Sequence, residues 1–191
     1  MDKKKKWKAA LHDSQTNREI AFVIDKTNYI EHTLKSILTK YIAARNDLTT
    51  FVNDILLHSS IVGLGQKIKL LHYIIDRERW PKIDVNHFHT VLNIRNAFAH
   101  SDTVTQHFVV NLRKNGPSGV TDAFQLLHTI SSSGDYRKVK RRDALDEFTQ
   151  SFVIVRDYLH DLDYNYASKV VQQGTQTAGT TSASQPNGHV E

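Results

Sequence analysis

The chain contains no cysteine, which excludes disulfides, thiolate zinc sites and a cysteine nucleophile. It also lacks any run of about 18 apolar residues, so the sequence predicts no membrane-spanning helix. The lysine-rich start is followed by no apolar segment and therefore does not resemble a secretory signal. These absences favour a cytoplasmic protein that does not bind membranes.

Positive charge is concentrated at the N-terminus. The formal net charge is +5, and residues 1–8 alone carry five lysines against Asp2. We interpret residues 1–15 as a solvated, disordered basic arm. The alternative is an arm that attracts nucleic acid or anionic lipid, as in a DNA-binding regulator. A second basic cluster lies inside the folded region, and four of its members are candidate RNA contacts: Arg137, Lys138, Lys140 and Arg141.

Apolar periodicity predicts an all-α fold, a bundle of four to five helices over residues 16–166. A capping-box spacing, Thr16 to Glu19, predicts the first helix start. The turn Gly63-Leu64-Gly65 opens the second long helix, which Trp80-Pro81 stops, and Asp84 is a plausible N-cap for the third. The expected helices cover residues 16–41, 64–80, 84–101 and 142–166, with a short piece at 51–57.

Between the third and last helices the pattern changes to that of strands. Residues 107–113 and 124–130 are rich in strand formers, and residues 115–119 have turn chemistry. We therefore expect a β-hairpin at about residues 105–131, inserted into the helical domain. Residues 167–191 have little apolar content and no periodicity, which predicts a disordered tail.

Familiar catalytic and cofactor motifs are missing. The sequence has no G-x-S-x-G, no phosphate-binding G-x-x-x-x-G-K and no H-E-x-x-H. Eleven histidines raise the question of a metal site, but His87 and His89 point about 200° apart on a helix and the acids are not spaced to complete a site. We predict neither a metal nor a cofactor.

The third expected helix carries an unusual polar pattern. His89, Asn93, Asn96 and His100 follow i, i+4, i+7, i+11 spacing and form a narrow stripe. On an ideal helix Arg95 projects from the middle of the adjacent apolar face, which consists of Phe88, Val91, Leu92, Phe98 and Ala99. Because a guanidinium keeps its charge, Arg95 needs an anionic partner. That partner is either an anion in a cleft or a buried acid such as Asp76, Asp102 or one on another helix.

The segment from Ile94 to Ser101, Ile-Arg-Asn-Ala-Phe-Ala-His-Ser, resembles the signature of the HEPN superfamily. That signature is an arginine, commonly followed by a polar residue, and a histidine after four intervening residues. The resemblance implies a small helical bundle with the motif near the end of the third long helix, and it covers about residues 16–166. The Gly-rich turn and helix before the motif are similar to those of the mannitol-repressor-like branch.

The resemblance implies a function for the motif residues. Many HEPN proteins are metal-independent endoribonucleases in toxin–antitoxin and other defence systems, and act as homodimers in which two motif helices meet. By position, Arg95 would bind the scissile phosphate of single-stranded RNA, Asn96 would assist orientation, and His100 would be the acid–base residue. An antitoxin or other regulatory protein is then an expected partner. Other family members are non-catalytic regulatory or partner-binding modules, so this alternative stays open.

The resemblance and the apolar pattern together predict how the chain assembles. An apolar helix face containing Phe88, Ala99 and an embedded Arg95 would be unusual on the surface of a monomer. We therefore expect a two-fold homodimer formed through the motif helix.

Overall fold

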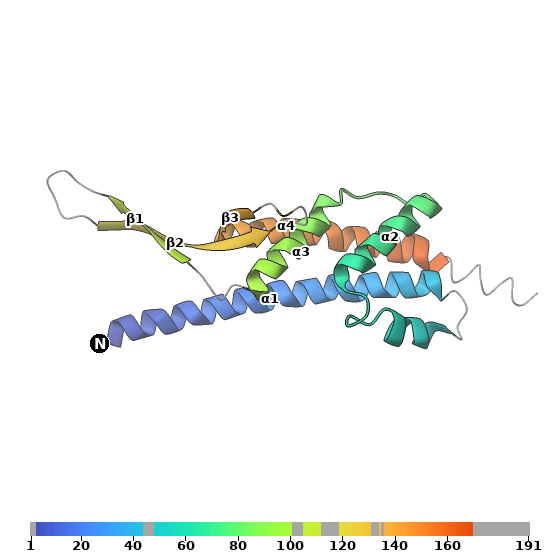
Figure 1. Cartoon of the computed structure of the whole chain (residues 1–191), viewed down its shortest axis with the longest axis horizontal. Helices are drawn as coiled ribbons and strands as arrows, with labels where there is room; N and C mark the ends of the chain where they lie inside the picture. The colour runs from blue at the N-terminus through green and yellow to red at the C-terminus, as the bar shows by residue number, and fades with distance from the viewer. Residues whose placement is uncertain are drawn as a thin grey trace, which may run out of the picture. The chain divides into compact units, whose positions relative to one another are not determined.

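The computed structural model describes residues 3–43, 48–100, 105–111, 119–130, 134 and 136–169. These residues are mostly helical with a small antiparallel sheet (Figure 1), which confirms the expectation of a helical fold carrying a hairpin. The helical elements are α1 (Lys3–Ile42), η2 (Phe51–Leu56), α2 (Leu64–Glu78), α3 (Asn86–Ala99), α4 (Arg141–Leu162) and η3 (Asp163–Ala167), where η2 and η3 are π-helical. The strands are β1 (Thr105–Asn111), β2 (Gly119–Ile130) and β3 (Tyr136–Lys140).

The chain divides into two compact units. The first comprises Met1–Tyr29 and Asp84–Val155, and it holds α3, the sheet and parts of α1 and α4. The second comprises Ile30–Ile83 and Arg156–Glu191, and it holds η2, α2, η3 and the remaining parts of α1 and α4. In the described part of the chain, no helix has the length and apolar character needed to cross a membrane.

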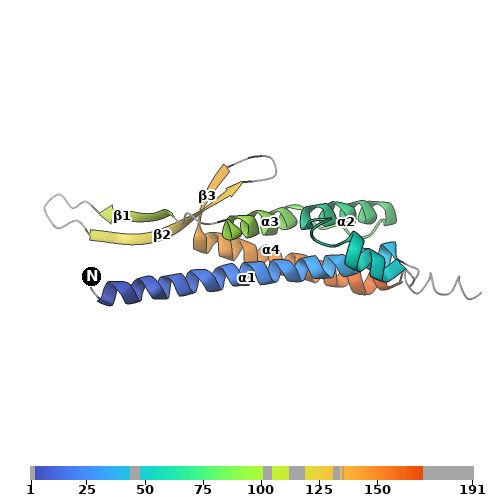
Figure 2. The same ribbon diagram turned by 60° about the horizontal axis from the view of Figure 1, so that its bottom comes forward.

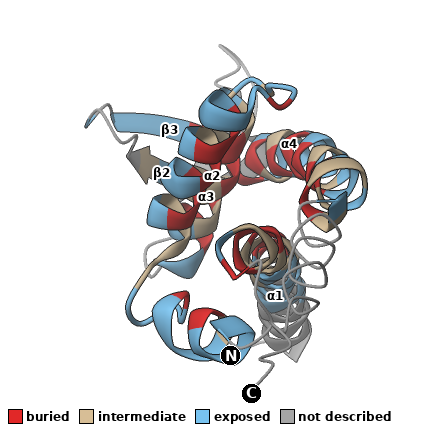
Figure 3. Ribbon diagram, turned by 90° about the vertical axis from the view of Figure 1, so that its right-hand side faces the viewer, coloured by how far each residue is buried: buried red, intermediate tan, exposed pale blue. Residues whose placement is uncertain are grey.

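Aromatic packing forms the centre of the first unit. Phe148 of α4 is fully buried, stacks on Phe152 with ring centroids 6.3 Å apart, and meets the edge of Phe22 from α1 at 6.2 Å. Figure 3 shows the buried residues as a stripe along one side of α4. The buried Phe148, Phe152 and Val155 lie at i, i+4 and i+7, the spacing of one helix face, because burial of each large apolar side chain favours this orientation.

The second unit is built around α2. Its buried positions Ile68, Leu71 and Ile75 lie at i, i+3 and i+7, the spacing of one helix face. Lys67 is also fully buried, and its ammonium lies 2.6 Å from the Glu31 carboxylate of α1. Buried charges in proteins are normally paired in this way, because an unpaired ion loses its hydration without compensation.

The end of α2 is followed by an aromatic cluster in the same unit. Arg79 adopts a left-handed conformation with φ 56°, and the Trp80 N–H donates to the Ile75 carbonyl at 3.0 Å. Trp80 packs against Tyr41 and Tyr166, with ring centroids 5.9 and 5.7 Å away. The predicted stop at Trp80-Pro81 thus agrees with the observed helix end. Nearby, burial raises the pKa of Tyr158, whose hydroxyl donates to the Pro81 carbonyl at 2.7 Å.

In the sheet, β2 is the central strand (Figure 2). Its first part pairs antiparallel with β1 and its last part with β3. The predicted hairpin matches β1 and β2, although the strands cover 105–111 and 119–130, and residues 112–118 lie outside the described residues. The third strand was not predicted. Val139 of β3 pairs with Leu127 of β2, and both are buried, which fixes the inward face of this pair.

The ends of the helical region differ from the predictions. Helix α1 begins at Lys3, so residues 3–15 are helical instead of a disordered arm, and Thr16 lies inside the helix instead of capping it. Lysine and alanine are good helix formers, and they extend a helix that packing of later residues has already nucleated. At the other end, Ala167 is buried in η3, although the tail was expected from residue 167. The rest of that tail, from residue 170, lies outside the described residues.

Candidate functional site

The buried face of α3 is rotated from the predicted one. Leu92 is only half-buried and Ala99 is exposed, so Arg95 lies at the flank of the buried face and not at its centre. Phe88 is buried inside its own chain, which excludes it from the predicted surface for dimerisation. An ideal helical wheel does not predict this rotation of the buried face, because the rotation depends on which elements pack against the helix. The buried residues are Phe88, Val91, Ile94, Ala97 and Phe98.

Arg95 is half-buried and bonds to its neighbour on the helix. Its Nη1 atom donates to Oδ1 of Asn96 at 3.1 Å. Among the described residues Arg95 forms no ion pair, and Asp76 instead pairs with Lys82 at 2.6 Å. Asp76 is 64% exposed, so it is not the buried acid that one alternative predicted, and Asp102 lies outside the described residues.

His100 caps the C-terminal end of α3. Its backbone N–H donates to the Asn96 carbonyl at 3.0 Å, and its side chain is exposed. Asn96 is exposed as well, and His89 and Asn93 on the same polar stripe are half-buried. The last turn and a half of α3 thus presents an arginine, an amide and an imidazole that solvent can reach.

Arg141 is not available to RNA, which corrects its prediction as an RNA contact. The residue is 5% exposed, and its Nε donates to the Glu19 carboxylate at 2.6 Å. Its other nitrogens donate to the Thr16 carbonyl at 2.9 Å and to the Gln125 side chain at 3.3 Å. The guanidinium also lies over the Phe98 ring, 5.0 Å from its centroid. Arg141 therefore links the start of α4 to α1, β2 and α3.

The other basic candidates lie on two faces of β3. Lys138 and Lys140 are exposed on the outward face together with Tyr136, whereas Arg137 lies beside the buried Val139. The Tyr136 hydroxyl is 2.9 Å from Nδ1 of His128 on β2, and the Lys138 ammonium lies 5.9 Å from the Tyr136 ring centroid.

Tyr136 and His128 are not among the site residues predicted from the sequence. The available signal was the two-residue alternation of Tyr136, Lys138 and Lys140, which indicates one face of a strand.

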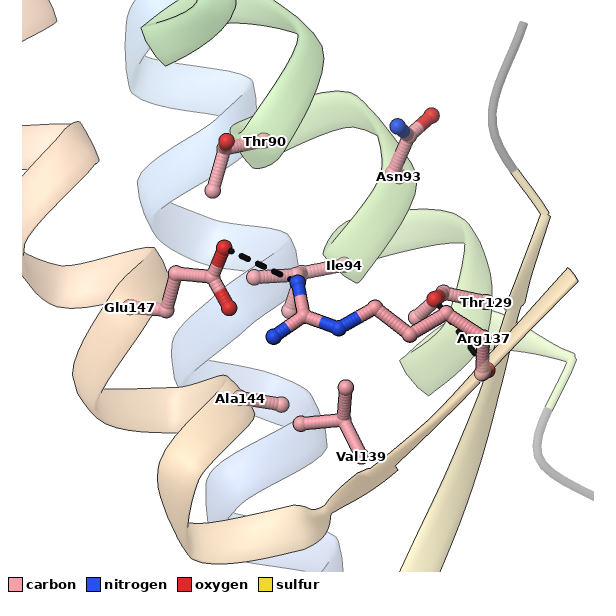
Figure 4. Close-up of a pocket in the computed structure, with 8 residues that line it drawn as sticks. All are labelled: Thr90, Asn93, Ile94, Thr129, Arg137, Val139, Ala144 and Glu147. Atoms are coloured by element: carbon pink, nitrogen blue, oxygen red, sulfur yellow. Dashed lines mark hydrogen bonds and ion pairs between the residues drawn. The ribbon is translucent and has the colours of Figure 1, made fainter. Parts of the chain in front are cut away.

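A cavity of about 180 Å³ lies between α3, the sheet and α4 (Figure 4). Ile94, Val139 and Ala144 form its apolar wall. The polar groups come from Thr90 and Asn93 of α3, Thr129 of β2, Arg137 of β3 and Glu147 of α4. Arg137 extends across the cavity toward Glu147, and Nη1 and Oε1 are 3.5 Å apart. No local sequence pattern predicts this cavity, because its walls come from segments far apart in the chain.

No group of three or more histidine, aspartate or glutamate side chains in the described ranges is arranged to hold a metal ion. Of the two histidines considered for such a site, His87 contacts Ser151, with Nδ1 and Oγ 3.4 Å apart. No protein-family model, curated protein or solved structure matches the chain.

Proposed function

We propose that the chain is an endoribonuclease of HEPN type that cleaves single-stranded RNA without a metal ion. The hydrogen bond from Arg95 to Asn96 carries this proposal. On an ideal helix Arg95 and His100 point about 140° apart, so their side chains would not act on the same phosphodiester. The bond to Asn96 turns the guanidinium toward the polar stripe on which His100 lies, and all three side chains are accessible.

His100 and Arg95 supply the two requirements of RNA cleavage, proton transfer and stabilisation of negative charge in the transition state. The His100 imidazole can accept the proton of a ribose 2′-hydroxyl as its oxygen attacks phosphorus. The bond from phosphorus to the 5′-oxygen breaks, that oxygen takes up a proton from the imidazolium that has formed, and a 2′,3′-cyclic phosphate remains. Arg95 has five N–H donors, so donors beyond the one bonded to Asn96 can stabilise the charge on the phosphorane-like transition state.

The outward face of β2 and β3 supports single-stranded RNA as the substrate. Exposed Tyr136 offers a ring on which a base can stack, and Lys138 and Lys140 provide positive charge beside it. Proteins bind single strands by this combination of aromatic stacking and backbone attraction.

The proposal includes the assembly and setting that the resemblance implies. Two copies would meet through the exposed end of α3, where Asn96 and Ala99 lie on the surface. We further propose a toxin or defence role, with an antitoxin or other regulatory protein as partner.

The acid–base role is tested with His100→Ala in a cleavage assay on single-stranded RNA with a chelator present. We expect cleavage to fall by about 10²–10⁴-fold, the usual contribution of a general acid–base group. Stability should be unchanged, because the side chain is exposed. His32→Ala removes another exposed histidine, on α1, and should retain full activity.

The phosphate-binding role is tested with Arg95→Ala, which should lose activity, and with Arg95→Lys, which should recover only part of it because an ammonium lacks the planar fork. Arg18→Ala, at an exposed position of α1, is the matched control. Wild-type protein that leaves RNA intact with and without divalent metal would contradict the nuclease proposal and favour a non-catalytic regulatory module.

A further inference from the structure

The cavity between α3, the sheet and α4 has the size of a site for one small planar group. Its volume of about 180 Å³ is below the roughly 300–1,000 Å³ of pockets that enclose drug-sized ligands. An apolar wall of Ile94, Val139 and Ala144 suits the face of a ring system, and the polar groups at the edge suit a ring that carries donors and acceptors. A nucleobase has these properties.

The charged groups at the cavity discriminate among the bases. The Glu147 carboxylate accepts hydrogen bonds at two oxygens, and the Arg137 guanidinium only donates. Guanine is the base that presents two adjacent donors, N1–H and N2–H, beside the acceptor O6. Adenine and cytosine each place a ring-nitrogen lone pair next to their amino group, where it would face the carboxylate, and uracil offers a single N–H between two carbonyls.

We propose that this cavity is the base-recognition pocket of the ribonuclease and that it binds guanine. Glu147 accepts from N1–H and N2–H, Arg137 donates to O6, and the base lies against Ile94 and Val139. The existing contact between Arg137 and Glu147 does not prevent this. It is 3.5 Å long and joins side chains that are 65% and 40% exposed, and such surface pairs contribute little.

The position of the cavity on α3 relates it to the cleavage site, and in this respect the inference rests on the proposed function. Asn93 lines the cavity and shares the polar stripe with His100, two helical turns further on. At 1.5 Å per residue, their separation along the helix axis is about 10 Å. A base in the cavity would therefore leave a neighbouring phosphodiester near the accessible end of α3.

The test is binding of the four ribonucleoside 5′-monophosphates to the full-length chain, measured by isothermal titration calorimetry. We expect the guanine nucleotide to bind at least about 10-fold more tightly than the other three, within the discrimination typical of a bidentate base contact. Glu147→Gln should abolish that preference, because an amide offers only one acceptor in place of two. Asp146→Asn, the same change of charge at the exposed adjacent residue, should retain it.

This experiment can refute the pocket assignment and the nuclease proposal independently of each other. Equal affinity for all four nucleotides, no binding of any, or a guanine preference that survives Glu147→Gln would overturn the pocket assignment, even if RNA is cleaved. A guanine preference that is lost in Glu147→Gln and retained in His100→Ala would support the pocket, even if the wild-type protein leaves RNA intact. In that case only the nuclease proposal fails.

Discussion

The guanidinium of Arg141 interacts with three other elements of the first unit, α1, β2 and α3. It pairs with Glu19, donates to Thr16 and Gln125, and covers the ring of Phe98. A sequence of consecutive basic residues cannot reveal which member is buried, because all of them have the same charge. The arginine most buried here begins α4, where the chain leaves β3.

Replacing Arg141 with methionine should lower the free energy of unfolding by about 3–5 kcal/mol, because the Glu19 carboxylate then loses its partner while remaining largely buried. Urea denaturation measures this change. Arg142→Met, at the exposed neighbouring position, should stay within about 0.5 kcal/mol of wild type. If Arg141→Met is as stable as Arg142→Met, the anchoring role is refuted.

At the scale of elements, apolar periodicity predicted the helices that bury a continuous apolar face. The buried positions of α2 and α4 have clear helical spacing, so both helices could be located from the sequence. The strand β3 has a single buried residue, Val139, and therefore no apolar pattern. The early turns of α1 were missed for a similar reason, since Lys3–Lys6 follow helical propensity without an apolar stripe.

The candidate site was predicted only in part. The polar stripe of α3 could be derived from spacing, because it depends on one helix alone. The rotation of that helix, the burial of Arg141 and the cavity at Glu147 depend on contacts between segments far apart in the chain. No local pattern encodes them.

The end of α2 offers a test of backbone conformation. Arg79 has φ 56°, which brings Cβ of a non-glycine residue close to the carbonyl. Arg79→Gly should raise the free energy of unfolding by about 0.5–1 kcal/mol, because glycine adopts this conformation without the steric cost. Arg79→Ala also removes the charge but keeps Cβ, so it should not raise the free energy of unfolding. Thermal denaturation of the two variants therefore distinguishes the effect of backbone conformation from the effect of the lost charge. Equal stability of both variants would refute the explanation.

At the scale of the whole molecule, the proposed nuclease requires two copies. We expect light scattering at tens of micromolar to give the mass of a dimer, because in the proposed assembly two motif helices meet. Ala99→Arg should shift the mass to that of a monomer, since a long charged side chain at the exposed end of α3 would keep two helices apart. Ala21→Arg, at an exposed alanine of α1, should remain dimeric. A monomeric wild-type protein would contradict this assembly.

The burial of Trp80 provides an optical reporter of folding. The chain has two tryptophans, and Trp80 is only 8% exposed between Tyr41 and Tyr166. An indole shielded from water emits at shorter wavelength than a hydrated one. In a Trp7→Phe variant, all tryptophan emission would come from Trp80, and its shift to longer wavelength would follow the loss of packing in the second unit. Energy transfer from the two adjacent tyrosines would disappear in the same transition.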